Sequence, residues 1–297
     1  MPDPNVATSA AGAFERQASV FRGRLEHAEP GRYHLYVADA CPWCHRTTIV
    51  RELMGLAGVL GVSYLDPIRD ERGWAFTGGK FVDQIEGISF LSEAYRRTDA
   101  SAAARITAPV LWDRERGRIV NNESSEIIRM FETGAFGGHG PDLYPQALAA
   151  EIDAINERVY ETVNNGVYRC GFARTQAAYE AAFVPLFETL DWLEQLLVER
   201  RYLLGDVLTE ADWRLFPTLV RFDSVYNGHF KCNLRRIVDY QNLWGYTREL
   251  YQLPGIAATV ALDEIKLHYY YTHPSINPTR IVPLGPAIDF AAPHGRG

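Results

Sequence analysis

The sequence predicts an α+β N-terminal domain, with the element order β-α-β-α-β-β-α, followed by an all-α C-terminal domain. Three observations support this fold class. A Cys-Pro-Trp-Cys motif at residues 41–44 stands between a strand-like run and a helical pattern. Residues 106–121 have the pattern of an antiparallel hairpin. From residue 147 onward, apolar side chains recur mainly at helical spacing.

The first predicted strand and helix surround Cys41. Residues 33–38 form a partly alternating apolar run, and the residues after Cys41 have the spacing of an amphipathic helix. Pro42 suits the first helical position, because its missing N–H would have no partner there. Cys41 is therefore expected at a helix N-terminus, whose partial positive charge, with His45 and Arg46 nearby, favours thiolate over thiol. His45 is a candidate base, or a side chain that points to solvent.

A Cys-x-x-Cys motif between a strand and a helix predicts redox or thiol-transfer chemistry at Cys41 and Cys44. Half of a structural zinc site and a pair of unreactive buried thiols are the alternatives. Zinc would need two further ligands, yet Cys170 and Cys232 are isolated in sequence and no histidine has ligand spacing to a cysteine. We therefore expect no metal, and we expect Cys170 and Cys232 to be buried as small apolar residues.

The remaining elements of the first domain follow in order. Residues 61–66 predict a second strand, which makes a parallel β-α-β unit with the first. Residues 68–104 predict one helix, at 90–97, in an otherwise irregular segment. The hairpin at 106–121 then leads into a helix. A β-α-β unit followed by β-β-α is the thioredoxin arrangement, in which a cis-proline precedes the third strand, and Pro109 stands at that point.

A run rich in glycine at residues 133–141 predicts the domain boundary. We expect an N-terminal arm at 1–30, a thioredoxin-like thiol-binding domain at 31–140, and an all-helical substrate domain at 141–297 with an extended C-terminal tail. Helices are expected at 147–164, at 176–200, from a capping box at 209–212, at 233–252, and in a shorter stretch ending at 267.

The composition restricts the class of protein. Hydrophobic residues make up 47% of the chain and charged residues 23%, as in ordinary soluble globular proteins. The net charge of −7 argues against a nucleic-acid partner or attraction to an anionic membrane. No secretory signal opens the chain and no apolar run approaches membrane-spanning length, so we expect a cytoplasmic protein without membrane or nucleic-acid partners.

Five longer stretches are distinctive: 33–45 (YHLYVADACPWCH), 121–130 (NNESSEIIRM), 164–173 (NNGVYRCGFA), 228–240 (GHFKCNLRRIVDY) and 268–286. They resemble the glutathionyl-hydroquinone reductases, also called the xi class, which are akin to the omega class of cysteine-type glutathione transferases. The resemblance extends from about residue 20 to 290. The family forms homodimers and uses glutathione as cosubstrate, and the resemblance implies the same here.

The resemblance also implies a reaction. Cys41 would attack the sulfur of a glutathionyl-hydroquinone, release the hydroquinone and keep a mixed disulfide, which a second thiol would then resolve. The backbone of Ala108, before Pro109, would pair with the cysteine of the thiol peptide. Glu123 and Ser124 match the acid–serine pair that holds the γ-glutamyl end, where the helix N-terminus adds donors for its carboxylate.

Aromatic residues complete the implied site. Trp74 matches the tryptophan that closes over glutathione. Tyr168 and Tyr269 match tyrosines that reach the hydroquinone oxygens, and Tyr270 is a close alternative to the second. A phenol O–H can hydrogen-bond a substrate hydroxyl and help to deliver the proton that the leaving ring carbon needs.

One departure from the family opens a second hypothesis. The usual motif is Cys-Pro-Trp-Ala, whereas Cys44 ends it here, so Cys44 is a possible resolving thiol that could close a disulfide with Cys41. The chain would then be a glutaredoxin-like dithiol oxidoreductase or deglutathionylase. A third hypothesis is a non-catalytic binding protein on a transferase fold.

The basic residues bear on the choice of thiol. Nearly all are arginine, and the only lysines are Lys80, Lys231 and Lys266, which indicates a GC-rich genome. Because such genomes include bacterial groups that make mycothiol, we expect either glutathione or mycothiol as the cosubstrate, with thiol and quinone conjugates as small-molecule partners.

Overall fold

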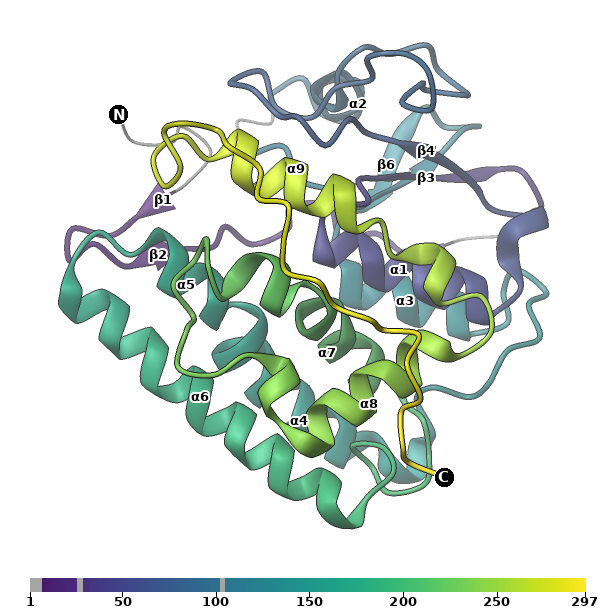
Figure 1. Cartoon of the computed structure of the whole chain (residues 1–297). Helices are drawn as coiled ribbons and strands as arrows, with labels where there is room; N and C mark the ends of the chain where they lie inside the picture. The colour runs from purple at the N-terminus through teal and green to yellow at the C-terminus, as the bar shows by residue number, and fades with distance from the viewer. Residues whose placement is uncertain (1–6, 26–28, 102–104) are drawn as a thin grey trace. The chain divides into compact units, whose positions relative to one another are not determined.

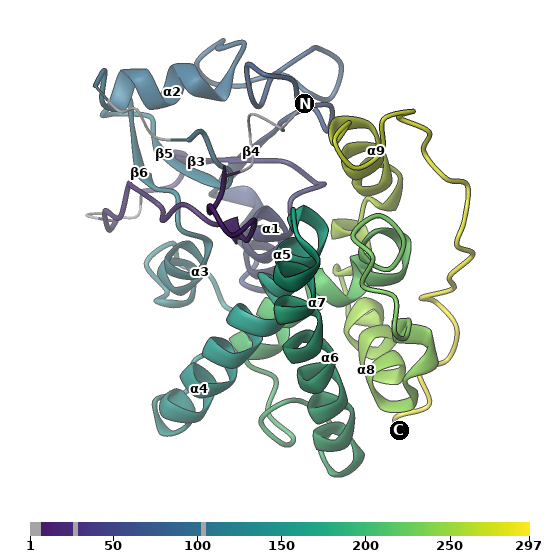
Figure 2. The ribbon, with the colours of Figure 1, turned by 90° about the vertical axis from the view of Figure 1, so that its left-hand side faces the viewer.

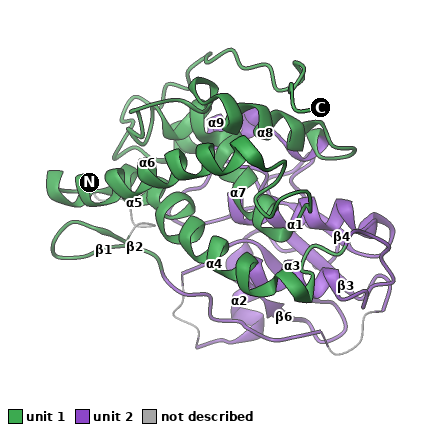
Figure 3. Ribbon diagram, turned by 90° about the horizontal axis from the view of Figure 1, so that it is seen from below, with its two compact units in different colours: residues 1–16, 142–257, 269–297 green, residues 17–141, 258–268 purple. Residues whose placement is uncertain are grey.

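The computed structural model describes residues 7–25, 29–101 and 105–297. The described chain forms two compact units (Figure 3): unit 2 comprises 17–141 and 258–268, and unit 1 comprises the described part of 1–16 with 142–257 and 269–297. Parts of the predicted arm (1–6 and 26–28) and of the predicted loop segment (102–104) lie outside the described residues. The domain borders predicted at 30 and 140 stay predictions.

Unit 2 contains the four-stranded mixed sheet with strand order β4-β3-β5-β6. Strands β3 and β4 are parallel, and the other neighbours are antiparallel. Helix α2 covers one face, and α1 and α3 cover the other (Figures 1 and 2). The elements are β3 (Tyr33–Val37), α1 (Pro42–Leu53), β4 (Gly61–Tyr64), α2 (Leu91–Thr98), β5 (Val110–Asp113), β6 (Arg118–Asn121) and α3 (Ser124–Glu132). This order confirms the predicted β-α-β-α-β-β-α arrangement.

The central strand β3 is buried along its whole length, as expected for a strand with helices on both sides. Leu35 pairs with Val62 on one side and Leu111 on the other. His34, also buried, shares a 2.8 Å hydrogen bond between its Nε2 and Ser63 Oγ. The His34 ring leaves no space for a side chain at position 61, because a Cβ atom on Gly61 would lie 2.6 Å from His34 Nδ1. Glycine is therefore required at the start of β4.

Unit 1 begins with a short hairpin of β1 (Ala7–Thr8) and β2 (Phe14–Glu15) and continues with helices. They are α4 (Ala149–Val159), α5 (Gly166–Phe172), α6 (Gln176–Glu199), α7 (Glu210–Arg221) and α8 (Gln241–Gln252), and α9 (Leu262–Thr272) belongs to both units. The helix predicted at 147–164 is observed as α4 followed by a π-helical turn at Tyr160–Asn164. This turn leads into α5. The capping box of α7 is confirmed, with Thr209 N donating to Asp212 Oδ2 at 2.8 Å.

The prediction of a helix at 233–252 is wrong for residues 233–240. Asp223 accepts hydrogen bonds from the backbone N–H groups of Ile237 and Val238, at 2.6 and 3.1 Å. These bonds and the Arg236–Asp239 capping interaction hold a short 3₁₀ turn at Ile237–Asp239. Helix α8 therefore begins only at Gln241. The prediction of a helix ending at 267 is wrong too, because α9 continues to Thr272.

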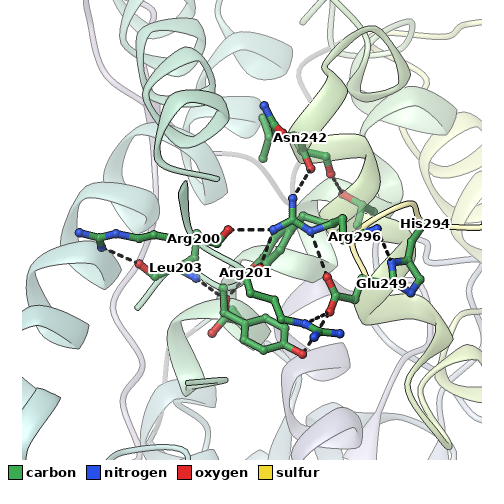
Figure 4. A network of polar contacts seen from close by, with 12 residues as sticks. Arg200, Arg201, Leu203, Asn242, Glu249, His294 and Arg296 are labelled. Carbon is green, nitrogen blue, oxygen red and sulfur yellow. Dashed lines mark hydrogen bonds and ion pairs between the residues drawn. The ribbon is translucent and has the colours of Figure 1, made fainter. Parts of the chain in front are cut away.

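The C-terminal tail of unit 1 has no regular structure and is anchored at two points. The Phe290 ring lies 5.4 Å from that of Trp244 and 5.2 Å from that of Tyr251, both on α8. Figure 4 shows the second anchor, where Arg296 donates to the Glu249 carboxylate and to backbone carbonyls that include that of Arg201. Across residues 7–25, 29–101 and 105–297, none of the helices has the length and apolar character that crossing a bilayer requires.

Candidate active site

Cys41 lies at the N-terminus of α1, as predicted. It is the N-cap residue, its φ and ψ of −81° and 122° are extended, and Pro42 occupies the first turn. Its carbonyl accepts the first helical hydrogen bond, from His45 N at 3.0 Å. The positive end of the helix dipole therefore acts on the sulfur and favours its anionic form.

The sulfur of Cys41 faces the loop before β5. Sγ lies 3.6 Å from the carbonyl oxygen of Ala108, and the Ala108–Pro109 peptide bond is cis. The structure thus brings Cys41, Ala108 and Pro109 together, three residues that the sequence analysis singled out separately. The Cys41 thiol therefore lies next to the backbone of the loop that precedes β5.

Cys44 is more deeply buried than Cys41. Cys41 keeps 9% of its surface exposed, and Cys44 keeps 1%. Burial raises the pKa of the Cys44 thiol well above its ordinary value, and the hydrogen bond that it donates to Cys41 acts in the same direction. Cys44 therefore stays protonated near neutral pH and serves as a hydrogen-bond donor to the Cys41 sulfur.

The two basic neighbours of the motif are buried. His45 is 2% exposed, and its Nε2 shares a 2.8 Å hydrogen bond with Thr259 Oγ1. The alternative in which His45 points to solvent is therefore wrong, because Thr259, more than 200 residues later in the chain, covers it. The Arg46 guanidinium lies 4.5 Å from the centre of the Trp43 ring, an attraction between a cation and an aromatic face.

Glu123 and Ser124 lie at the start of α3. Glu123 is the N-cap, and its carboxylate accepts from Ser125 N at 3.2 Å and from Ser125 Oγ at 2.9 Å. Its other oxygen accepts from Ser19 Oγ at 2.8 Å. Nothing in the local sequence indicates Ser19, because a serine more than 100 residues away reaches the cap only through folding. Ser124 is buried beside it.

Trp74 is held by stacking. Its ring lies 5.1 Å from that of His268, with an interplanar angle of 15°. His268 Nδ1 shares a 2.6 Å hydrogen bond with the carbonyl of Pro67, which fixes the orientation of the imidazole. The Arg69 guanidinium lies 5.3 Å from the Trp74 ring centre. Sequence reasoning missed His268 as a partner of Trp74.

Unit 1 brings two of the predicted tyrosines together. The hydroxyls of Tyr168, on α5, and Tyr269, on α9, are 2.5 Å apart. Tyr226, which the sequence analysis missed, lies at the end of the π-turn after α7, with its hydroxyl 3.0 Å from that of Tyr269. Tyr270 is not part of this group, because its hydroxyl points to the Ser224 carbonyl at 3.4 Å. We call Tyr168, Tyr226 and Tyr269 the phenol cluster.

The members of the phenol cluster differ in burial. Tyr226 and Tyr269 are almost fully buried, whereas Tyr168 is half-buried. Burial raises the pKa of both Tyr226 and Tyr269 well above its usual value, and the positive charge of Arg221 opposes that rise only in part. Both therefore keep their O–H near neutral pH.

Metal ligands do not gather anywhere in the described ranges: no group of three or more His, Cys, Asp or Glu side chains lies close enough to hold an ion. Cys170 and Cys232 are both buried in unit 1, where the Cys232 thiol donates to the backbone carbonyls of Phe230 and Val167, at 3.8 and 4.0 Å. Burial raises the pKa of Cys232 well above the ordinary thiol value, so it is expected to be unreactive.

The fold is that of glutathione transferases. The family model described as "Glutathione S-transferase, N-terminal domain" matches residues 40–133, and "Glutathione S-transferase, C-terminal domain" matches 176–249. The chain is 53% identical to glutathionyl-hydroquinone reductase PcpF of Sphingobium chlorophenolicum, covering 94% of this chain and 91% of the relative. It is 49% identical to glutathionyl-hydroquinone reductase YqjG of Escherichia coli, covering 97% and 93%.

Solved structures agree. The glutathione-bound structure of YqjG from Escherichia coli matches with a TM-score of 0.87 at 47% identity, covering 98% of this chain and 95% of that one. The xi-class transferase of Phanerochaete chrysosporium matches with a TM-score of 0.89 at 48% identity, covering 94% and 95%. The chain belongs to the xi class of glutathione transferases, the family of the glutathionyl-hydroquinone reductases, and the family predicted from the sequence is confirmed.

Proposed function

We propose that this enzyme reduces glutathionyl-hydroquinones with a low-molecular-weight thiol. The observation that carries the proposal is Cys41, an N-cap cysteine whose sulfur lies 3.6 Å from the Ala108 carbonyl. The family relationship supports the substrate class, since two relatives at about half identity are named glutathionyl-hydroquinone reductases.

The proposed reaction has two steps. The Cys41 thiolate attacks the sulfur of the conjugate, so that an S–S bond forms and the bond between sulfur and the aromatic carbon breaks. The electron pair of that bond stays on the ring carbon, which takes up a proton and leaves as hydroquinone. A second thiolate then attacks the mixed disulfide, which releases the oxidised thiol and restores the Cys41 thiolate.

Residues of unit 2 are proposed to hold the thiol. The backbone of Ala108, next to Pro109, would pair with the cysteine portion of glutathione. The N-terminus of α3 offers N–H donors to its α-carboxylate, while Glu123 and Ser124 would hold the γ-glutamyl end. Trp74 would cover the bound peptide, and its stacking on His268 keeps the ring in place for that role.

Residues of unit 1 are proposed to serve the hydroquinone. A ring carbon is a poor leaving group unless it is protonated as the bond breaks, so the step needs a positioned acid. Tyr168 and Tyr269 carry hydroxyls 2.5 Å apart and would provide that acid and hydrogen bonds to the ring oxygens. Tyr270 would only line the substrate site, because its hydroxyl is directed to Ser224.

A second function is favoured by one observation, the contact between Cys44 and Cys41. If Cys44 resolves the mixed disulfide, the enzyme is a dithiol oxidoreductase or deglutathionylase. If Cys44 only donates a hydrogen bond, Cys44→Ser should keep turnover of glutathionyl-hydroquinone within a few-fold, because serine is also a donor. Loss of all turnover in Cys44→Ser would establish the dithiol mechanism.

We also propose that the protein is a homodimer in the cytoplasm, without nucleic-acid or membrane partners. Its cosubstrate is proposed to be either glutathione or mycothiol. The arginine-rich composition keeps mycothiol open as the cosubstrate. Light scattering after size-exclusion chromatography tests the dimer. A doubled chain mass supports it, and a single chain mass at assay concentration overturns it.

Steady-state release of hydroquinone tests the proposed function. The full chain is mixed with glutathionyl-hydroquinone and either glutathione or mycothiol, and free hydroquinone is measured by chromatography. Release that depends on one of the two thiols and disappears in Cys41→Ser is expected. No release with either thiol, from folded protein, would contradict the proposal.

A further inference from the structure

Residues 17–23, which we call the edge segment, lie against the outer edge of β6 in unit 2. Strand β6 is the last strand of the sheet, and Arg22 pairs with Asn121 at its end in an antiparallel bridge. Gly23 N donates to the Val120 carbonyl at 2.9 Å. A Cβ atom on Gly23 would lie 2.7 Å from that carbonyl oxygen, so the close approach requires glycine. The edge segment thus covers backbone groups that an edge strand would otherwise expose.

The edge segment supplies one side chain to the proposed thiol site. Ser19 Oγ donates to Glu123 Oε2 at 2.8 Å, and Glu123 Oε1 accepts from the N and Oγ of Ser125 at 3.2 and 2.9 Å. Both oxygens of this half-buried carboxylate are therefore held. An ionised carboxylate accepts about four hydrogen bonds, so these three leave capacity for a ligand. Because its orientation is already fixed, the carboxylate loses little rotamer freedom when a ligand binds.

The edge segment also supports the loop that carries Ala108. The Phe21 ring packs edge-on against that of Tyr95, with ring centres 5.4 Å apart. The Tyr95 hydroxyl donates to the Thr107 carbonyl at 2.9 Å and accepts from Thr107 N at 3.1 Å. Thr107 directly precedes Ala108, whose peptide bond with Pro109 is cis. One short segment therefore supports both backbone regions that are proposed to hold the thiol.

We propose that Ser19 is a positioning residue of the thiol site, which fixes Glu123 in the orientation that accepts the α-ammonium group of a γ-glutamyl thiol. A fixed carboxylate selects a ligand with an ammonium group, since a ligand without one leaves the charge unpaired. Glutathione has such a group, whereas mycothiol has an acetylated cysteine and no ammonium group. The inference rests on the thiol site of the proposed function and selects glutathione from its two proposed cosubstrates.

Binding of S-methylglutathione, which has no free thiol, tests the role of Ser19 without turnover. In isothermal titration calorimetry of the full chain, Ser19→Ala should weaken binding about fivefold, because a hydrogen bond that orients the carboxylate is lost. Ser19→Thr keeps a hydroxyl and should restore the affinity. Ser92→Ala is the matched control and should bind like the unsubstituted chain, because the Ser92 hydroxyl of unit 2 accepts from Arg96 instead.

A second ligand and a second background show whether the effect passes through Glu123. The analogue of S-methylglutathione with a glutaryl group in place of γ-glutamyl lacks only the ammonium group. Ser19→Ala should change its affinity by less than about twofold, and should likewise add less than about twofold to the loss in Glu123→Gln. Gly23→Ala, which forces the edge segment away from β6, should also weaken S-methylglutathione binding and tests the same contact without removing a hydroxyl.

Two results of the calorimetry would overturn the proposal. The same S-methylglutathione affinity in Ser19→Ala and the unsubstituted chain would show that Ser19 does not position Glu123. Equal losses for S-methylglutathione and its glutaryl analogue would indicate a general loosening of the site rather than an oriented charge.

Turnover separates this inference from the proposed function. In Ser19→Ala, KM for glutathione should rise about fivefold while kcat changes little. An unsubstituted chain that does not bind S-methylglutathione would overturn the role of Ser19, although hydroquinone release with mycothiol would still support the proposed function. Conversely, a Ser19-dependent affinity in a chain that releases no hydroquinone would support the role of Ser19 and contradict the proposed function.

Discussion

The thiol site of unit 2 and the phenol cluster of unit 1 are built in different ways. Cys41, Pro42 and Cys44 are neighbours in the chain, and one strand-to-helix junction positions them. The hydroxyls of Tyr168 and Tyr269 meet although 101 residues separate them in sequence. The sulfur chemistry thus depends on a local motif, while the proton chemistry depends on tertiary packing.

This difference has a chemical counterpart. When a thiolate attacks a disulfide, the group that leaves is another thiolate, so no carbon atom has to be protonated. Release of a hydroquinone requires a proton on the ring carbon. Unit 2 alone should therefore suffice for disulfide exchange, and the phenol cluster should matter only when an aromatic ring leaves. Substitutions in each of the two sites test this separation.

Cys41→Ser should have the largest effect. Serine at an N-cap keeps the helix start but lacks the thiolate, so turnover should fall by roughly a thousandfold or more with both glutathionyl-hydroquinone and 2-hydroxyethyl disulfide. Steady-state rates with both substrates measure it. Activity with either substrate above one-tenth of normal would place the nucleophile elsewhere.

Tyr269→Phe should separate the two substrates. A hydroxyl proposed to provide the acid or to bind the ring oxygens is lost, so kcat for glutathionyl-hydroquinone should fall roughly a hundredfold. The rate with 2-hydroxyethyl disulfide should stay within twofold, because no carbon is protonated in that reaction. Equal losses on both substrates would show that the phenol cluster supports the fold or the thiol site rather than the leaving ring.

Acid should destabilise unit 2 through His34. Burial lowers the pKa of His34 to about 4, so between about 4 and 6.5 the unfolded chain binds a proton that the folded chain does not. Stability therefore rises with pH across this window and falls on acidification, by roughly 2 kcal/mol from this histidine between pH 7 and pH 5.

Urea unfolding of the unsubstituted chain and of His34→Gln, at pH 7 and pH 5, measures the contribution. The variant should lose about 2 kcal/mol less than the unsubstituted chain on acidification, whatever its stability at pH 7. The same acid sensitivity in both proteins would mean that His34 is protonated in the folded state.

Glu123→Gln should have the smallest effect. The amide keeps the shape of the N-cap but removes the charge proposed to hold the γ-glutamyl end, so KM for glutathione should rise about tenfold with little change in kcat. Glu126→Gln is the matched control, since Glu126 lies on the same first turn and pairs with Arg22 instead. A KM that rises equally in both variants would indicate a loss of general charge rather than a specific contact.

The sequence predicted most of what depends on neighbouring residues. The strand, Pro42 and the helical periodicity were sufficient to place Cys41 at a helix start, and the thioredoxin arrangement of the predicted elements placed Pro109 beside it. The Thr209–Asp212 capping box was predictable because both partners lie within one turn. The family resemblance also identified Tyr168 and Tyr269, although nothing in their local sequence shows that their hydroxyls meet.

Long-range contacts account for what sequence reasoning missed. The stretch at 233–240 has helical spacing, but Asp223 from an earlier segment binds its backbone N–H groups and prevents the helix. Thr259 covers His45, and Ser19 completes the cap at Glu123. Tyr226 has no motif of its own, and only the folded chain brings its hydroxyl to 3.0 Å from that of Tyr269.

Mass spectrometry of the first reaction step shows whether Cys41 is the nucleophile. Cys44→Ser protein is mixed with one equivalent of glutathionyl-hydroquinone without a second thiol, digested and analysed. We expect a glutathione adduct on the peptide of Cys41 and an equal amount of free hydroquinone. A hydroquinone-bearing protein, or an adduct on Cys170 or Cys232 with Cys41 unmodified, would contradict it.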